Sequence, residues 1–188
     1  ATESDGTTTS PSAGRIGITN DKIYINPSNN LSGNRNYAIR IDATAVDDSA
    51  GNSFPGINDD TSFNFSTGNT APAVDLDSTS GSDDSSVSFS EGAGAVNIAA
   101  NAAVTEADGD TLTTITVSLT NDQDGVSEGL NISASAQDAL TGVSGSSDIT
   151  LQDTISITGA TASAAEVQTF LQAITYNNTS SSPNQTSR

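Results

Sequence analysis

The stretch Ser66-Thr-Gly-Asn-Thr-Ala-Pro-Ala-Val-Asp-Leu-Asp77 decides how the chain is organised. A β-rich segment ends just before it at Phe63-Asn64-Phe65, and a second β-rich segment begins at Val74. Acidic residues are frequent on both sides of it. Carboxylates held close together repel one another until a cation or a proton compensates them. We therefore interpret this stretch as a junction between two β modules and expect calcium to stiffen it.

The composition limits the partners of the chain. Its 188 residues allow two small domains. The 23 acidic residues against 5 basic ones give a formal charge of −18. Nucleic acids and anionic membranes both need a basic surface, so we expect neither as a partner. There is also no apolar run of the roughly 20 residues that a membrane-spanning helix needs, so we expect no membrane insertion.

The residue types that are absent exclude most catalytic machinery. The chain has no Cys, His, Met or Trp, which excludes a Ser/His/Asp triad, thiol nucleophiles, and the usual zinc and haem ligand sets. Paired carboxylates could serve a glycosidase, but its sugar platform usually needs aromatic side chains. The three Tyr and five Phe lie mostly at strand positions that face a core. We therefore expect no enzyme.

Strand patterns follow one another along the first half. Ile16 to Ile25 predicts a hairpin that turns at Asn20-Asp21. Tyr37, Ile39 and Ile41 alternate with polar residues and predict a half-buried strand. A long loop separates this strand from Phe63-Asn64-Phe65.

The second half shows the same alternation and one helical pattern. The predicted strands contain Val87 and Phe89; Val96 and Ile98; Ile115, Val117 and Leu119; Leu130 and Ile132; Ile149 and Leu151; and Ile155 and Ile157. Ser163-Ala-Ala-Glu166 has the pattern of a capping box, and apolar residues follow it at helical spacing. We expect a single short helix near 163–172, before a strand at Ala173–Tyr176.

Two resemblances refine this interpretation. The segment YAIRIDATAVDDSAGNSFPGINDDTSFNFST, with D-x-A-G-N-x-F-x-G at its centre, resembles bacterial immunoglobulin-like repeats over residues 16–67. The segments NTAPAVDLD, SFSEG, TEADGDTL, TNDQDG and ITYNNT resemble cadherin-like repeats of giant RTX-type bacterial adhesins over residues 69–188. The resemblances imply an extracellular module, secreted or on the surface of a bacterium.

Together these patterns predict an all-β fold of two tandem Ig-like or cadherin-like β-sandwich modules. We expect the C-terminal part of an Ig-like domain at residues 1–67, an acidic linker at 68–77, and a cadherin-like domain without its last strand at 78–188. The expected function is structural, as an adhesin or filament module stiffened by calcium. A carbohydrate- or ligand-binding adhesin module is the alternative.

The calcium prediction rests on oxygen-bearing side chains that we expect to meet at one pole of the second module. Calcium takes about 6 to 8 oxygen ligands. The candidates are Asn69, Asp75, Glu91, Glu106, Asp108 and Asp110. The cadherin resemblance assigns this role to Asn69, Glu91 and Asp108, whereas Glu106 stands where that family more often has Asp.

Other acidic groups are weaker candidates. A second metal site or a plain polar loop is equally compatible with Asp47, Asp48, Asn52, Asp59 and Asp60. The turn Asn121-Asp122-Gln123-Asp124-Gly125 with Glu128 lacks EF-hand spacing, and we interpret it as a solvated hairpin turn.

The expected partners are neighbouring modules or identical subunits joined by strand pairing, with cell-surface or matrix glycans for the adhesin alternative. Both modules lack strands that the resembled families have, and open strand edges invite pairing with another chain. We therefore expect Ala1–Thr9 or Thr179–Arg188 to pair with a second chain.

Overall fold

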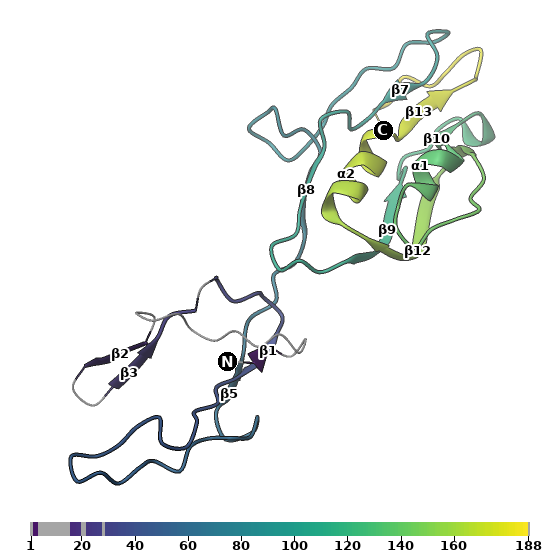
Figure 1. Cartoon of the computed structure of the whole chain (residues 1–188). Helices are drawn as coiled ribbons and strands as arrows, with labels where there is room; N and C mark the ends of the chain where they lie inside the picture. Colours follow the sequence, from purple (N-terminus) through teal and green to yellow (C-terminus); the bar gives the residue numbers. More distant parts are fainter. Residues whose placement is uncertain (1, 4–15, 20–21, 28, 188) are drawn as a thin grey trace. The chain divides into compact units, whose positions relative to one another are not determined.

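The computed structural model describes residues 2–3, 16–19, 22–27 and 29–187, and the chain divides into two compact units, Ala1–Thr70 and Ala71–Arg188. Every pair of named strands in the described residues is antiparallel. Figure 1 shows the helices and most of the strands along the chain. The predicted all-β class is confirmed. The division between the units lies inside the predicted linker, residues 68–77.

Three short strands form the sheet of the first unit. β4 (Asn36–Ala38) lies between β1 (Thr2–Glu3) and β5 (Asn64–Ser66). The strand predicted from Tyr37 to Ile41 is shorter than expected. After β4 the chain forms isolated β-bridges instead of a continuous strand, among them the bridge between Ile41 and Ile57. The predicted Phe63–Phe65 strand is confirmed as β5, shifted by one residue.

The predicted hairpin is present. β2 (Ile16–Thr19) pairs with β3 (Lys22–Ile25), with Ile16 opposite Ile25 and Thr19 opposite Lys22. The predicted turn residues 20–21 lie outside the described residues, as does the polar segment 4–15.

The buried apolar residues in the described part of the first unit are Tyr37 and Ala38. The Tyr37 ring stacks on Phe65, the residue opposite it on β5, with 5.6 Å between the ring centroids. Thr67 Oγ1 donates to the Ser32 carbonyl at 2.7 Å, and the Ser32 N–H donates to the Tyr37 hydroxyl at 2.9 Å. These bonds extend the small core with polar contacts.

The second unit contains three antiparallel strand groups. The largest has the order β11-β10-β13-β7. Its members are β11 (Ile149–Gln152), β10 (Glu128–Ile132), β13 (Thr175–Asn178) and β7 (Val96–Asn97). The others are the pairs β12 (Thr154–Ala162) with β9 (Leu112–Ser118), and β6 (Ala73–Asp75) with β8 (Ala103–Thr105).

Two predicted boundaries differ from this arrangement. The predicted linker, residues 68–77, contains the strand β6. Val74 of β6 pairs with Val104 of β8, so this part of the predicted linker belongs to the second unit. The strand predicted around Val87 and Phe89 is not formed. Phe89 is instead held by a side-chain contact, with its ring edge-on to Tyr176 at 5.3 Å.

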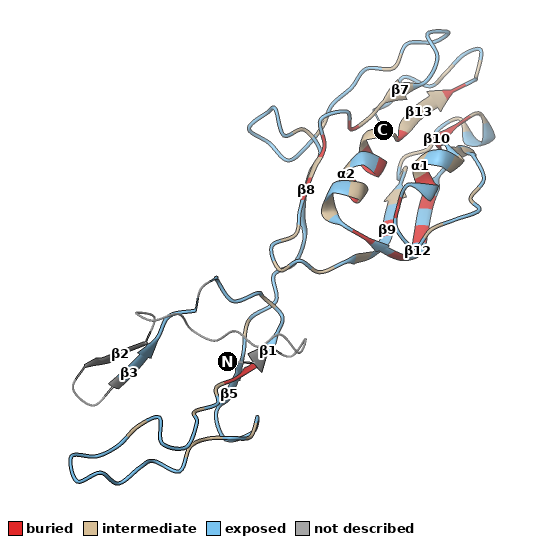
Figure 2. Ribbon diagram, in the orientation of Figure 1, coloured by how far each residue is buried: buried red, intermediate tan, exposed pale blue. Residues whose placement is uncertain are grey.

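One continuous hydrophobic core lies within the second unit. Figure 2 shows its buried residues along β9, β10, β12 and α2 (Ala164–Gln172). The largest side chains at its centre are Phe170, Leu140, Ile155 and Ile174, each no more than 1% exposed. The helix α2 thus fills the space between the strands with its apolar face.

The predicted helix is confirmed as α2, and its capping box is present. The Ser163 hydroxyl accepts the Glu166 N–H at 3.3 Å, and the Glu166 carboxylate accepts the Ser163 N–H at 2.7 Å. These reciprocal bonds satisfy two of the N–H groups that the first turn of a helix leaves open.

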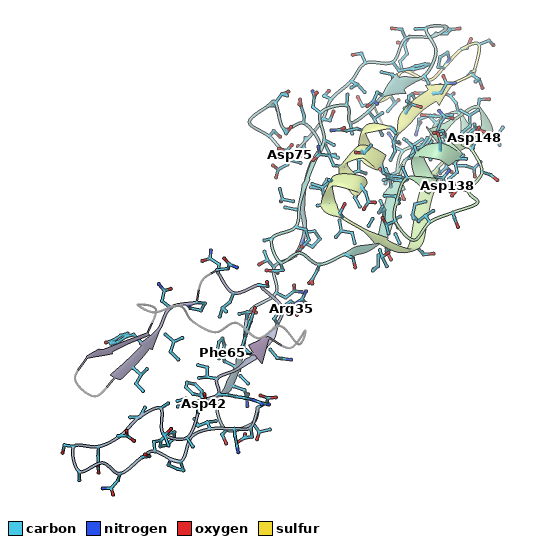
Figure 3. The ribbon with its side chains drawn as sticks, in the orientation of Figure 1. Arg35, Asp42, Phe65, Asp75, Asp138 and Asp148 are labelled. Carbon is cyan, nitrogen blue, oxygen red and sulfur yellow. The ribbon has the colours of Figure 1, made fainter. Side chains whose placement is uncertain are left out.

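A second helix, α1 (Ala134–Asp138), contradicts the prediction of a single helix. It has only five residues, too few to show an apolar period. The connection that follows it fixes both of its ends: Asp148 accepts the Ala134 N–H at 2.7 Å, and Asp138 accepts the Ser146 N–H at 3.0 Å (Figure 3). Gly125–Ser127 adds a short 3-10 turn, η1.

Candidate functional site

Glu106, a predicted calcium ligand, closes the loop after β8. Its carboxylate accepts the Asp108 N–H at 3.1 Å through one oxygen and the Asp110 N–H at 2.7 Å through the other. Gly109 between them has φ +76, a conformation that glycine adopts without steric cost. The Glu106 side chain therefore serves as an acceptor for the N–H groups of its own loop.

The other predicted ligands lie in three different settings. Asp75 is the last residue of β6 (Figure 3), and it accepts the Asp77 N–H at 2.9 Å. Glu91 is exposed in a turn. Asn69 is exposed in the first unit.

The predicted calcium ligands come from both units, with Asn69 in the first unit and the other five residues in the second. Calcium needs several convergent oxygen ligands. Among the residues that the structure describes, no three acidic side chains form a group that could hold a metal ion. The predicted ligand set stays a prediction from the sequence.

In the first unit, two residues of the predicted second cluster act as loop acceptors. Asp48 Oδ1 accepts the N–H groups of Ala50 at 2.9 Å and Asn52 at 2.8 Å, and its Oδ2 accepts Asn52 Nδ2 at 2.8 Å. The bond from the Asn52 side chain is the main cause that lowers the pKa of Asp48. Asp47 accepts the Ser53 hydroxyl at 2.5 Å.

The remaining acidic residues of that cluster, Asp59 and Asp60, also accept hydrogen bonds. Asp59 accepts the hydroxyls and N–H groups of Thr61 and Ser62, which hold its pKa well below its usual range, with the Thr61 hydroxyl contributing most. Asp60 forms a two-bond ion pair with Arg40, with both N···O distances 2.8 Å. Hydrogen bonding from Arg40 lowers the pKa of Asp60.

The D-x-A-G-N-x-F-x-G pattern thus has a structural explanation. Its first residue, Asp48, holds the loop through the bonds just described. Its last residue, Gly56, has φ +86 and packs so tightly that a Cβ would lie 2.6 Å from the Ile41 carbonyl oxygen. Any larger residue would push the loop away from the Ile41 and Ile57 bridge.

The turn expected to be solvated, at 121–128, is instead a compact network of acceptors. Asp122 Oδ1 accepts the N–H groups of Asp124 at 3.0 Å and Gly125 at 2.8 Å. Glu128 Oε2 accepts the N–H groups of Gln123 at 3.0 Å and Asp124 at 2.9 Å. Two carboxylates therefore organise the backbone of one turn.

This network continues into β13. Tyr176 donates its hydroxyl to Glu128 Oε1 at 2.7 Å, and Asn178 Nδ2 donates to Asp124 Oδ2 at 2.7 Å. Glu128 is 0% exposed and Asn178 is 5% exposed. The expectation of a solvated turn is therefore wrong for Glu128, because its carboxylate is buried and accepts hydrogen bonds from Gln123, Asp124 and Tyr176.

A sequence signal for this network was present. T-N-D-Q-D-G and Y-N-N-T are two of the segments that carry the cadherin-like resemblance, and they lie about 50 residues apart in the chain. The structure brings them together through Asp124 and Asn178. This bond joins the two segments in the folded second unit.

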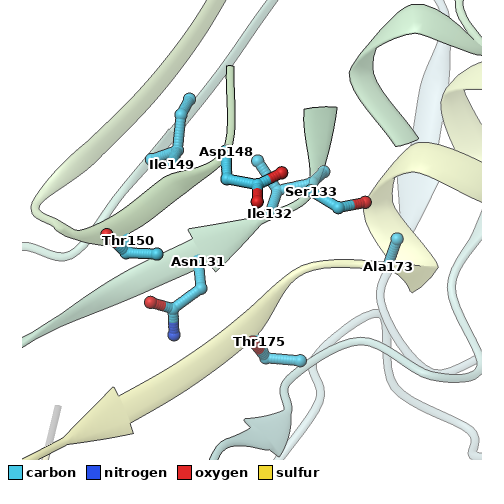
Figure 4. A pocket seen from close by; sticks show the side chains of 8 residues that line it. All are labelled: Asn131, Ile132, Ser133, Asp148, Ile149, Thr150, Ala173 and Thr175. Carbon is cyan, nitrogen blue, oxygen red and sulfur yellow. The ribbon is translucent and has the colours of Figure 1, made fainter. Parts of the chain in front are cut away.

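A shallow depression of about 260 Å³ lies beside β10 and β11 (Figure 4). It is lined by Asn131, Ile132, Ser133, Asp148, Ile149, Thr150, Ala173 and Thr175. Asp148 and Ser133 cap α1, and Asn131 Oδ1 accepts the Leu151 N–H at 2.9 Å. No aromatic side chain is among the lining residues, so the depression lacks the platform on which sugars stack.

The comparisons with known proteins concern the first unit. Residues 1–67 match the model of the bacterial Ig-like domain family. This match supports a bacterial Ig-like repeat in that part of the chain. No curated protein and no solved structure matches the chain.

None of the helices among the described residues has the length and hydrophobicity that a membrane span requires.

Proposed function

We propose that this chain is a structural segment of a bacterial surface protein, in which two β units in tandem extend the protein away from its anchor. The observation that carries the proposal is the match of residues 1–67 to the bacterial Ig-like domain. A second compact antiparallel unit follows it in the same chain.

The way the acidic side chains are used agrees with a structural role. Asp48, Asp59, Glu106 and Glu128 accept hydrogen bonds from their own loops. Bonds to ionised acceptors are stronger than those between neutral groups. The polar loops are therefore ordered by the same residues that give the chain its charge.

Protease treatment of intact bacteria that express the parent protein tests this role. Peptides from both units should be released before the cells lyse, with a cytoplasmic marker protein as the control. Release of these peptides only after lysis would contradict the proposal.

Calcium stiffening and strand pairing with a further chain are separate parts of the proposal. Calcium is supported by the sequence pattern of Asn69, Asp75, Glu91 and Asp108. Strand pairing is supported by the physics of open sheet edges. In the structure, Thr2 and Glu3 of β1 pair with β4 of the same chain.

A further inference from the structure

We infer that the strand β9 is a self-association edge, along which two copies of the chain pair antiparallel to form one continuous sheet. The combined sheet has the order β12-β9-β9-β12, with a two-fold axis at Thr116. This inference rests on the proposed structural role and deepens it, because it names the partner for strand pairing, a second copy, and the strand that receives it.

The backbone of β9 faces its partner β12 at every second residue (Figure 1). The Leu119 N–H donates to the Asp153 carbonyl at 2.7 Å, and the register of this bond continues along the strand pair. Bonded pairs alternate with non-bonded pairs in an antiparallel ladder, so the odd-numbered residues of β9 exchange bonds with β12. The N–H and C=O groups of Thr114, Thr116 and Ser118 therefore point away from β12.

This outer side of β9 is an open sheet edge. In the described residues β9 pairs with β12 alone, and no hydrogen bond from a described residue reaches the outward backbone groups of Thr114, Thr116 and Ser118. The side chains of these three residues are exposed, whereas Ile115 between them is 8% exposed. A strand added at this edge therefore continues both the polar outer face and the apolar inner face of the sheet.

β9 lacks the features that protect other edges of the second unit. Proteins blunt open edges with charged residues, with proline or with bulges. On β12 the register shifts beside Gly159, which has φ +75, and the register between β10 and β11 shifts beside Leu151, which has φ +50. The run 111–120 that contains β9 has no charged residue, no Pro and no Gly. Its threonines and branched apolar residues favour an extended strand.

The formal charge of −18 limits where two copies of the chain can meet. Like charges directly opposite one another on neighbouring strands are destabilising. Because the run 111–120 is uncharged, two copies can pair along it without placing one carboxylate opposite another. The charge elsewhere opposes the association, so the dimer should strengthen as salt screens it.

The open positions of β9 are also complementary to one another. A two-fold axis at Thr116 places Thr114 opposite Ser118 of the second copy, and Thr116 opposite Thr116 of the second copy. Each outward backbone position thus meets another outward position, and the hydroxyl side chains face one another in favourable cross-strand pairs. Two-fold dimers with such self-complementary contacts are the commonest homo-oligomers.

Cysteine cross-linking of the full chain tests this register. The chain has no Cys, so each variant carries a single thiol. Residues in a bonded antiparallel pair have Cα atoms about 5.5 Å apart, which suits a disulfide. Thr116→Cys should therefore form a covalent dimer under mild oxidation. Ser156→Cys is the matched control and should stay monomeric, because Ser156 is also exposed and lies opposite Thr116 on β12, away from the axis.

Sedimentation equilibrium of the full chain tests the association itself. The wild type should form a reversible dimer with twice the mass of one chain, and the dimer fraction should rise with salt. Thr116→Pro should be monomeric, because proline removes the N–H that donates across the axis and spares the bonds to β12. Ser156→Pro changes an outward position of β12 and should dimerise like the wild type.

Three outcomes would overturn the inference: a wild type that stays monomeric at high protein and salt concentrations, an undiminished dimer in Thr116→Pro, and cross-linking of Ser156→Cys as fast as that of Thr116→Cys. Thr116→Lys replaces the proline variant if that variant does not fold, and it should also be monomeric because it places like charges across the axis. None of these measurements depends on where the parent protein is located, so surface proteolysis and self-association can fail independently.

Discussion

Gly129 lies directly against the backbone of Leu151: a Cβ added to Gly129 would stand 2.7 Å from the Leu151 Cα and 2.6 Å from the Gln152 nitrogen. The contact occurs where the register between β10 and β11 shifts. Leu151 has φ +50 there, a conformation that few non-glycine residues adopt. The strands approach this closely because position 129 has no side chain.

Gly129→Ala should therefore destabilise the second unit. The added methyl group meets backbone atoms that cannot rotate away, and overpacking of this kind costs about 1–3 kcal/mol. Urea unfolding followed by circular dichroism measures the change. Gly81→Ala is the control, because nothing lies within 4 Å of the Cβ it adds. Equal midpoints for the two variants would contradict the prediction.

Glu166 should make stability depend on pH in the acidic range. Its pKa is lowered from 4.5 to about 2, first by the Thr141 hydroxyl and then by the N–H and hydroxyl of Ser163. A carboxyl group with a lowered pKa in the folded state stabilises that state above its unfolded pKa, and this contribution is lost as the pH falls toward 2.

Thermal midpoints from pH 6 to pH 2 test this dependence. The wild type should melt above Glu166→Gln at pH 6, and the difference should shrink below about pH 4.5 and vanish near pH 2. Asp153→Asn provides the comparison for an exposed carboxylate and should show little difference from the wild type. If the difference in thermal midpoint between the wild type and Glu166→Gln stayed constant with pH, the stabilising bonds of Glu166 would not depend on the ionisation of its carboxyl group.

Phe170 should contribute most strongly to the core of the second unit. It is 1% exposed on α2, and replacing a buried Phe by Ala costs about 3–5 kcal/mol through lost burial and the cavity left behind. Val126→Ala is the control, because Val126 is 93% exposed and its replacement should change stability by less than about 0.5 kcal/mol. Urea unfolding measures the free energy of unfolding of both variants. A loss of stability in Phe170→Ala as small as that in Val126→Ala would contradict the prediction.

The sequence predicts that calcium raises the thermal midpoint, because a ligand that binds the folded state stabilises it. A melt in calcium and in EGTA measures this. The double variant Glu91→Gln with Asp108→Asn should lose the response, whereas Asp153→Asn should keep it. An unchanged midpoint of the wild type in EGTA would rule out the calcium prediction.

Local signals in the sequence predicted the structure where local bonds form it. The helix α2 was predictable because Ser163 and Glu166 are three residues apart and cap one another. The hairpin of β2 and β3 was predictable for the same reason, since its strands are neighbours in the chain.

Distant contacts account for what the sequence did not predict. Val87 and Phe89 alternate with polar residues as a strand would, yet Phe89 is held by Tyr176 rather than by a ladder of backbone bonds. The burial of Glu128 depends on Tyr176, 48 residues away. The alternation of apolar and polar residues around Phe89 and Glu128 does not reveal these distant partners.

Six carboxylates of the chain keep their charge further into the acidic range than free carboxyl groups do. Hydrogen bonding lowers the pKa of each of them: Asp48, Asp59, Asp60, Asp77, Asp138 and Glu166. A formal charge of −18 therefore decreases less on mild acidification than free carboxyl groups would allow. Copies of the chain should consequently go on repelling one another in mildly acidic surroundings, where many acidic proteins lose their charge and coagulate.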